Sequence, residues 1–336
     1  MKRLYKTIAL MMTIAVLAAL CLTGCSAGKP AGSGELTKVT FCLEWTPNTN
    51  HTGLYVARKL GYFKDAGLDV DIVMAGDSTA ALMVASGQAA FGIDGQDTMA
   101  AALIGEDALD IVAVATIIQH NTSCLMSLKS DGITSPAKLE GKKYATWNSP
   151  IEIAVIKYLM EKDGGDFSKL QLIPNEFYDE PAALKSDVCD SIWIFYAWGG
   201  VYAEMQEADM DYLFLKDYAS ELDYYTPVII SSNKYLGSNP ETAKAFMAAV
   251  KKGYEYAIDH PDEAADILLA AVPDVGDKDF IHASQKELSA NYKGSEASWG
   301  KIDPARWNSF YNWLNNNVSM EEKLPENIGF TNDYLN

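Results

Sequence analysis

The sequence predicts an α/β protein with two lobes. Apolar stretches of strand length alternate with segments of helical length along most of the 336-residue chain, and this alternation is typical of parallel βαβ units. It occurs in two series of similar size, and a helical tail follows the second series. With 49% hydrophobic and 11% aromatic residues, the chain can bury the large core that two lobes need.

The two series contain strands and helices in regular alternation. In the first, the predicted strands are 38–44, 68–73, 90–93 and 111–118, and the helices are 52–60, 78–86 and 98–104. In the second, the strands are 142–146, 170–173, 191–195 and 227–231, and the helices are 151–162, 181–185 and 202–207. Short apolar strands separated by helices of this length indicate parallel pairing.

The sequence of the C-terminal tail predicts three helices. The first spans 239–258, since Asn239 is a capping residue, Pro240 suits the first helical position and Glu241 adds an early acid. Its apolar residues recur at helical spacing. Two more helices are predicted at 279–292 and 304–315.

Two extended segments, 125–131 and 225–231, are predicted to connect the lobes. Residues 36–128 and 230–336 then form the first lobe, with the helical tail packed on it, and residues 129–229 form the second. The cleft between them is lined by the carboxyl ends of strands and the loops that follow, where open α/β sheets bind ligands.

The N-terminus predicts export. Lys2, Arg3 and Lys6 precede an apolar run over 8–20, and small residues lead to Cys25. This arrangement resembles a bacterial lipoprotein signal, which implies that residues 1–24 are removed, that Cys25 carries lipid and that residues 25–35 are a tether. The protein is then held at the extracytoplasmic face of the cytoplasmic membrane. A plain signal peptide or an N-terminal membrane helix is the alternative, although the apolar run is shorter than the roughly 20 residues of a span.

The charge of the chain argues against anionic partners. The formal net charge is −18, and it becomes −21 once the three basic residues of the leader are removed. Such a surface repels nucleic acid and anionic lipid, and does not attract phosphorylated or sulfonated ligands. We expect a neutral or cationic ligand, no nucleic-acid partner and a monomer.

The cysteines and histidines follow no metal or redox pattern. Beyond the leader and the lipidation site, only Cys42, Cys124 and Cys189 remain, widely spaced in apolar stretches and without a C-x-x-C motif. We interpret these thiols as small buried hydrophobes. The four histidines are scattered. We therefore expect no metal and no cofactor.

The most informative motif follows the first predicted strand. Trp45 lies where the strand ends and a Pro-Asn turn begins, which places it on a loop at the carboxyl edge of the sheet. Asn48, Asn50 and His51 bring polar groups to the N-terminus of the next helix. The alternative is a capped helix with a packed tryptophan and a surface histidine.

A weaker motif, Gly92-Ile93-Asp94-Gly95-Gln96-Asp97, follows the third strand. It offers backbone N–H groups and Gln96 to the cleft. A turn that caps the next helix explains it equally well.

Taken together, several segments resemble one protein family. Trp45-Thr46-Pro47-Asn48 with His51 and Gly53, followed by Gly61-Tyr62-Phe63 and Gly67-Leu68, is similar to the opening of solute-binding proteins of thiamine-precursor ABC transporters. The wider family also includes sulfonate and taurine binders and the pyrimidine synthases of thiamine biosynthesis. Segments 147–152, 190–198 and 223–230 are similar to the same branch. The resemblance therefore covers residues 38–334.

This resemblance implies a type II periplasmic-binding-protein-like fold with a hinge and an interlobe cleft, and a protein that delivers its ligand to an ABC permease. The implied ligand is a thiamine pyrimidine precursor in its hydroxymethyl, aminomethyl or formylaminomethyl form. Relatives often carry an acid after the last tryptophan of the aromatic strand end, whereas this chain has Gly199-Gly200. Glu44, Glu152 and Glu204 are the candidates for the missing carboxylate, and Glu152 is preferred.

Aromatic residues at predicted strand ends support a planar heteroaromatic ligand. Those expected to line the cleft are Trp45, Trp147, Tyr196, Trp198 and Tyr225. Stacking contributes about 0.5–1.5 kcal/mol for each ring beyond burial. A carboxylate beside Asn48 or His51 matches the amino group and ring nitrogens of an aminopyrimidine. Trp193 and Phe195 are expected to point into the core instead.

Two other functions stay open. Riboflavin or another flat heterocycle suits the same aromatic residues. The alternative from another class is an enzyme like the thiamine-pyrimidine synthases, in which the resemblance implies that a histidine matching His51 and a cysteine-rich segment act with pyridoxal phosphate. The chain has no such cysteine cluster, so we expect a binding protein and not an enzyme.

Overall fold

The structure is a computed structural model that describes residues 35–174, 177 and 179–335. By its internal contacts the chain divides into two units, Met1–Glu35 and Leu36–Asn336. All the helices and strands below belong to the second unit, which is described by itself. The predicted leader, Cys25 and the predicted tether except for Glu35 lie outside the described residues.

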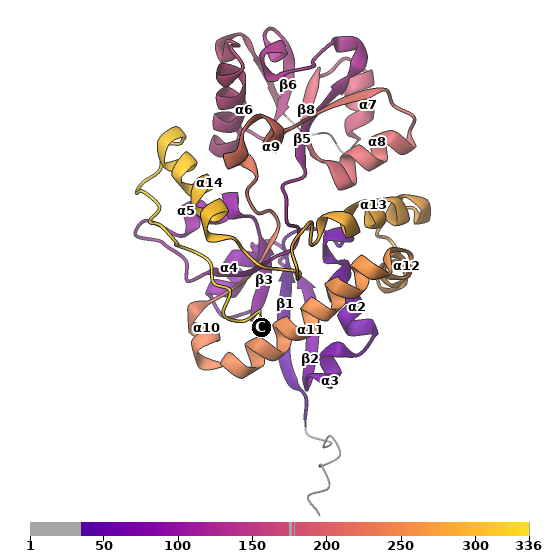
Figure 1. Cartoon of the computed structure of the whole chain (residues 1–336), viewed down its shortest axis with the longest axis vertical. Coiled ribbons are helices and arrows are strands. Elements are labelled where there is room, and N and C mark those ends of the chain that lie inside the picture. The colour runs from indigo at the N-terminus through magenta and orange to yellow at the C-terminus, as the bar shows by residue number, and fades with distance from the viewer. Residues whose placement is uncertain (1–34, 175–176, 178, 336) are drawn as a thin grey trace, which may run out of the picture. The chain divides into compact units, whose positions relative to one another are not determined.

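The described strands form two five-stranded sheets (Figure 1). The first has the order β2-β1-β3-β10-β4. In it, β1 (Thr37–Leu43) is parallel to β2 (Leu68–Met74) and β3 (Phe91–Asp94). β10 (Val228–Ser231) runs antiparallel to β3 and to β4 (Val112–Thr116). The predicted parallel βαβ pattern is therefore confirmed, with β10 as the antiparallel member.

Helices pack around the first sheet. They are α2 (Thr52–Lys59), α3 (Tyr62–Asp65), α4 (Ala80–Ala85), α5 (Gln96–Ala102), α10 (Asn233–Ser238), α11 (Pro240–Asp259), α12 (Pro261–Ala271), α13 (Lys278–Asn291) and α14 (Pro304–Asn317). Phe246 of α11 stacks on Phe91 of β3 and on Phe63, with ring centroids 4.2 and 5.5 Å apart. Helices α11 and α12 also pack on α2, so the tail returns to the first lobe.

The second sheet has the order β7-β6-β8-β5-β9. β6 (Lys143–Thr146) is parallel to β7 (Gln171–Pro174) and β8 (Ser191–Phe195). β5 (Ser123–Leu128) runs antiparallel to β8 and to β9 (Met210–Phe214). The accompanying helices are α6 (Pro150–Lys162), α7 (Glu180–Lys185), the π-helix η5 (Tyr196–Gly200), α8 (Val201–Met205) and α9 (Leu215–Tyr218).

Two segments cross between the sheets, over residues 117–122 and 219–227. They are tied to each other through Asp223. Its Oδ2 lies 2.7 Å from Nδ1 of His120, and its Oδ1 accepts the backbone N–H of Asn121 at 2.9 Å. The crossings are therefore held side by side.

Strand pairing corrects the predicted lobe boundaries in two places. Residues 123–128 are predicted in the first lobe, but as β5 they pair with β8 and β9 of the second sheet. Val228 and Ile229 are predicted in the second lobe, but they pair with β3 and β4. A short apolar strand and an extended crossing share one sequence pattern, so only the pairing distinguishes them. The other lobe boundaries stay predictions.

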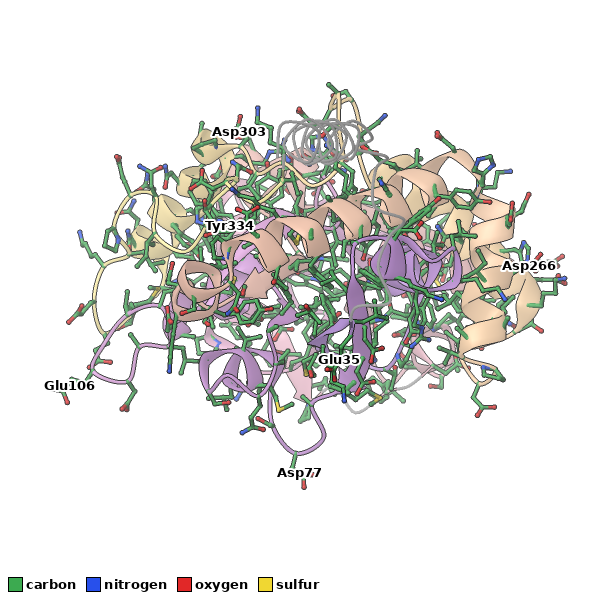
Figure 2. All side chains as sticks on the ribbon, turned by 90° about the horizontal axis from the view of Figure 1, so that it is seen from below. Glu35, Asp77, Glu106, Asp266, Asp303 and Tyr334 are labelled. Atoms are coloured by element: carbon green, nitrogen blue, oxygen red, sulfur yellow. The ribbon has the colours of Figure 1, made fainter. Side chains whose placement is uncertain are left out.

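Many acidic side chains lie at the surface of the protein and the cysteines of the folded body lie in its interior, as the sequence predicts. Figure 2 shows Asp77, Glu106 and Asp266 pointing away from the ribbon, and all three are exposed. The three cysteines of the folded body are unpaired and buried, which confirms their interpretation as small hydrophobes. Within the part of the chain that the structure describes, no helix is long and apolar enough to cross a membrane.

Candidate ligand-binding cleft

The carboxyl ends of the parallel strands in both sheets meet the crossings. β10 begins directly after the second crossing and runs antiparallel to β3, so β3 and its parallel neighbour β1 end beside that crossing. β5 begins directly after the first crossing and runs antiparallel to β8, so β8 and β6 end there too. Open α/β sheets bind ligands at such edges.

A small hollow lies at this place, with about 270 Å³ of space free of atoms when the open solvent at its mouth is included. Its lining includes residues of the β1–α2 loop, of both crossings and of the segment that ends β8. Among them are Asn50, Thr122, Phe195, Trp198, Thr226 and Pro227. Residues of both sheets therefore meet in one cleft, as the sequence predicts.

Two tryptophans are strongly exposed beside this cleft. Trp45 follows β1 and is 68% exposed, and Trp147 follows β6 and is 51% exposed. They occupy equivalent positions, each in the loop after the strand that pairs in parallel on both of its sides. Exposed indoles leave a large apolar area in water, and such area commonly marks a binding site. Both residues are predicted ligand contacts, and this prediction stays open.

His51 holds the Glu44 carboxylate at the end of β1. The His51 side chain is fully buried; its Nδ1 accepts the backbone N–H of Asn48 at 3.1 Å, and its Nε2 lies 3.2 Å from both Glu44 oxygens. A ring nitrogen that accepts a hydrogen bond carries no proton, so Nε2 carries it and donates to Glu44. His51 is therefore neutral, and Glu44 keeps its negative charge with 30% of its side chain exposed.

Asn48 also serves the loop. Its Oδ1 accepts the backbone N–H of Asn50 at 2.9 Å, and its Nδ2 donates to the carbonyl of Thr46 at 3.1 Å. From the sequence, Asn48 and His51 are expected to contact the polar edge of a ligand. In the structure, both side chains fix the conformation of the loop that presents Glu44 and Trp45.

Glu152, the preferred carboxylate of the sequence analysis, is buried and fully bonded. Its Oε1 accepts the Tyr144 hydroxyl at 2.8 Å, and its Oε2 accepts the Thr146 hydroxyl at 2.9 Å. The backbone N–H groups of Trp147 and Ser149 donate to it as well, at 3.3 and 3.4 Å. Four internal donors leave this carboxylate no free position for a ligand, so it has a structural role as part of the α6 capping box.

The predicted aromatic contacts of the second lobe differ in accessibility. The Tyr196 hydroxyl donates to the exposed Glu204, and its ring packs on Tyr212 with centroids 5.1 Å apart. Trp198 lines the cleft and meets Phe280 of α13 edge-on, with centroids 4.6 Å apart. Trp198 is therefore placed to touch a ligand, whereas Tyr196 and Glu204 bond to each other.

Tyr225 lies in the second crossing and is only 1% exposed. Its hydroxyl accepts the backbone N–H of Asp303 at 3.0 Å, and its own N–H donates to Oε1 of Gln96 at 2.9 Å. Nε2 of Gln96 donates to the carbonyl of Trp307 at 2.8 Å. Tyr225 and Gln96 therefore fasten the crossing to α5 and α14 and present no side-chain surface to the cleft.

Phe195 is the aromatic residue that the sequence analysis assigns wrongly. It is predicted in the core, but it ends β8, is 43% exposed and lines the cleft. The position of Phe195 at the end of a predicted strand is the signal for this exposure, because the last residue of a parallel strand lies at the carboxyl edge of the sheet. Trp193, two residues earlier, is 5% exposed, as predicted.

Asp94 is the last residue of β3 and Asp97 lies in the first turn of α5, both in the weaker motif that follows the third predicted strand. Burial is the main cause that raises the pKa of both carboxyl groups above 3.8, and for Asp97 the pKa reaches about 6. Asp94 adds to the rise at Asp97 because the two negative charges repel. Oδ1 of Asp97 is buried without a hydrogen-bond partner among the described residues.

Replacing Asp97 with asparagine is expected to stabilise the protein at pH 8 and not at pH 4. Because the pKa is raised on folding, the folded state binds the proton more tightly, and the free energy of unfolding falls as pH rises from about 4 to about 6. A rise of about two units corresponds to at most roughly 3 kcal/mol. Urea titrations of Asp97→Asn at both pH values measure the difference, with the exposed Asp107→Asn as the control. A stability difference that does not change with pH would contradict the expectation.

The fold and the cleft define the class of protein. The chain has the type II periplasmic-binding-protein fold. The alkanesulfonate-binding protein SsuA of Xanthomonas axonopodis pv. citri bound to MOPS is similar, with a TM-score of 0.64 and 11% identity, covering 89% of this chain and 99% of that one. The periplasmic aliphatic sulphonate-binding protein SsuA of Escherichia coli is similar with a TM-score of 0.62 and 14% identity, covering 86% and 95%.

The chain belongs to the NMT1/THI5 like family, which matches residues 48–264. It is 27% identical to the formylaminopyrimidine-binding protein of Halalkalibacterium halodurans, over 94% of this chain and 96% of that protein. It is 25% identical to the 4-amino-5-hydroxymethyl-2-methylpyrimidine phosphate synthase of Candida albicans, over 89% and 88%. The family predicted from the sequence is confirmed, and the relatives of the chain include both a binding protein and a synthase.

Proposed function

We propose that the chain is the solute-binding protein of an ABC importer and that it binds a thiamine pyrimidine precursor in the cleft. The precursor is a hydroxymethyl-, aminomethyl- or formylaminomethyl-pyrimidine. The observation that carries the proposal is the pair of exposed tryptophans at the ends of β1 and β6: Trp45, which follows the partly exposed, charged Glu44, and Trp147. The similarity to a formylaminopyrimidine-binding protein over nearly both full lengths supports it.

In this proposal the aromatic residues hold the ring and Glu44 holds its polar edge. A planar heterocycle gains about 0.5–1.5 kcal/mol from each stacking partner beyond burial. An aminopyrimidine presents an amino group beside a ring nitrogen, and a carboxylate accepts hydrogen bonds from such an edge. Glu44 therefore takes the role for which the sequence analysis prefers Glu152. Trp198 and Phe195 complete the contacts of the second lobe.

Binding fits this site better than catalysis. The synthases of the family are the rival, and the resemblance gives them a reacting histidine at the position of His51. Here the His51 ring is fully buried and both of its nitrogens are bonded. It has no free position from which to transfer a proton to a ligand in the cleft. The predicted cysteine-rich segment of the enzymes has no counterpart either, since the three thiols of the folded body are far apart in the sequence, with Cys42 buried in one apolar cluster and Cys124 and Cys189 in another.

The predicted lipid anchor at Cys25 belongs to the same proposal. A tether of about ten residues would hold the binding protein at the extracytoplasmic face of the membrane, within reach of an ABC permease. The binding lobes would close about the two crossings, and the permease would recognise the closed form.

Removing either exposed tryptophan is expected to weaken ligand binding. A buried aromatic contact at the centre of an interface contributes about 2 kcal/mol, which corresponds to a roughly 30-fold higher Kd. Calorimetric titration of Trp45→Ala and Trp147→Ala with the three pyrimidine precursors measures this, and riboflavin serves as the competing ligand. Val188→Ala is the control, because Val188 is exposed but precedes the amino end of β8, away from the cleft. Unchanged pyrimidine affinity in both tryptophan variants, or tighter binding of riboflavin, would overturn the proposal.

A further inference from the structure

Two carboxylates lie next to each other at the carboxyl ends of β1 and β3, the edge of the first sheet that meets the crossings. β1 and β3 are parallel neighbours in which Phe41 pairs with Phe91 and Cys42 with Gly92. Continued to the residue that follows β1, the same offset places Glu44 opposite Asp94, the last residue of β3. Neighbouring strands are about 4.8 Å apart, so the two side chains start within reach of one ligand group.

Neither carboxylate is neutralised by the protein. In the described residues, the sole ion-pair partner of Glu44 is His51, which is neutral by its hydrogen bonds. Oδ1 of Asp94 accepts the backbone N–H of Gly95 at 2.8 Å and the hydroxyl of Thr98, and both are uncharged donors. Oδ2 of Asp94 has no partner among the described residues. Two adjacent carboxylates without a cation repel each other, and the charge of Glu44 indeed contributes to the raised pKa of Asp94.

Asp97 adds a third carboxylate whose Oδ1 is buried and unpartnered. A Cβ atom built on Gly95 would lie 2.4 Å from Oδ1 of Asp97 and 3.0 Å from Oγ1 of Thr226, which lines the hollow. Because residue 95 is glycine, both oxygens can approach the backbone here, and Oδ1 of Asp97 lies near a residue of the cleft lining. A buried oxygen without a donor is costly.

These three side chains, Glu44, Asp94 and Asp97, form an acidic edge of the cleft. No group of three His, Cys, Asp or Glu side chains in the described residues is arranged to hold a metal ion. An organic cation with several N–H donors suits the edge better. The exposed indole of Trp45, next to Glu44, adds a face over which a cation is attracted.

We propose that the acidic edge selects a cationic ligand, so that the chain binds the pyrimidine precursor with a free aminomethyl group, as its ammonium ion, in preference to the neutral hydroxymethyl and N-formyl forms. This inference rests on the proposed function and narrows its ligand class. The ammonium supplies the positive charge and the N–H donors that the edge lacks. An N-formyl group removes both the charge and two donors, so it leaves the carboxylates unpaired.

The test compares three pyrimidines at pH 7.5 by titration calorimetry: the 5-aminomethyl, the 5-(formylaminomethyl) and the 5-hydroxymethyl form of 4-amino-2-methylpyrimidine. The wild type is expected to bind the amine at least about tenfold more tightly than either neutral form, since a charge-assisted hydrogen bond contributes about 1.5–3 kcal/mol. Asp94→Asn is expected to remove most of this preference by weakening the amine alone. Glu44→Gln is expected to weaken all three pyrimidines, because Glu44 also holds the 4-amino edge that they share, and to weaken the amine most. Asp71→Asn on the exposed face of β2 is the matched control and is expected to keep the preference.

Two further probes separate this inference from the proposed function. Benzylammonium and benzyl alcohol share a ring but differ in charge, and neither is a pyrimidine. If no pyrimidine binds while benzylammonium binds more tightly than benzyl alcohol in the wild type and not in Asp94→Asn, the acidic edge selects cations and the pyrimidine assignment fails. If the N-formyl form binds as tightly as the amine, the pyrimidine assignment stands and the cation selection fails. Binding of neither cation by the wild type overturns the inference as well. Circular dichroism melting of each variant verifies that it folds.

Discussion

Replacing Glu152 with alanine is expected to lower the stability of the protein by about 3 kcal/mol or more. The change removes the acceptor of two buried hydroxyls, those of Tyr144 and Thr146, and of two backbone N–H groups in the β6–α6 loop. Each buried donor without an acceptor costs about 1–3 kcal/mol, and loop water replaces some of the lost bonds. Burial and the adjacent carboxylate also raise the pKa of Tyr144, so its hydroxyl stays protonated and needs an acceptor.

Urea unfolding of Glu152→Ala measures this loss, and two variants make the result specific. Glu152→Gln keeps the size of the side chain but replaces one acceptor oxygen with a donor, so an intermediate loss is expected. Glu161→Ala lies at the far end of α6, where the exposed carboxylate has only a 3.9 Å pair with Lys157, and little change is expected. Wild-type stability together with lost pyrimidine binding in Glu152→Ala would instead support the role that the sequence analysis gives this residue.

Local patterns in the sequence predict most of the fold. β8 begins and ends at the predicted residues 191 and 195. α11 begins at Pro240, one residue after its predicted start. β5 is missed as a strand because extended backbone in a crossing and in a sheet have the same apolar pattern, and the pairing with β8 is a tertiary contact. α12 is also missed, although Pro261 followed by acidic residues is a helix-start signal.

The cleft is predictable only in part, for a physical reason. Trp45 and Trp147 follow predicted strands, so their position at the carboxyl edge needs no tertiary information. The partners of a polar side chain do need it. The residues around Glu152 in the sequence do not indicate that its carboxylate accepts hydrogen bonds from internal donors. Those around Tyr225 do not indicate that its side chain packs inward beside a helix of the tail. Glu44 and Asp94 come close together because β1 and β3 are neighbours in the sheet. The order of strands in a sheet cannot be seen in a local sequence pattern.

A second large loss of stability is expected from replacing Gly253 with alanine. Gly253 lies on α11 where this helix crosses α2, and a Cβ atom there would lie 2.0 Å from the carbonyl oxygen of Gly53 and 3.0 Å from Cβ of Ala57. The two helix backbones touch because both positions are glycine. The obstacle is backbone and cannot rotate away, so the helices must separate.

Separation of α11 from α2 would disturb contacts on both sides of Gly253. Phe246 stacks on the central strand β3, and the Tyr254 ring stacks on Trp299 with centroids 4.3 Å apart. The Tyr254 hydroxyl donates to the carbonyl of Asn50 at 2.7 Å, which joins α11 to the loop that carries Trp45. Overpacking of a core costs about 1–3 kcal/mol and at times more, and the helix propensity that alanine gains, about 1 kcal/mol, offsets only part of a cost at the upper end.

We therefore expect Gly253→Ala to unfold at a clearly lower urea concentration than the wild type and to bind ligand more weakly through the displaced Asn50 loop. Gly237→Ala is the matched control, since this glycine lies in helix α10 with open space where a Cβ would be. That substitution is expected to leave stability unchanged or slightly higher, because alanine favours the helix without meeting a neighbour. If the two variants unfold alike, the close contact of α11 and α2 at Gly253 does not limit the packing of the first lobe. If only Gly253→Ala is destabilised, the contact between two glycine backbones holds the helix that positions the cleft loop.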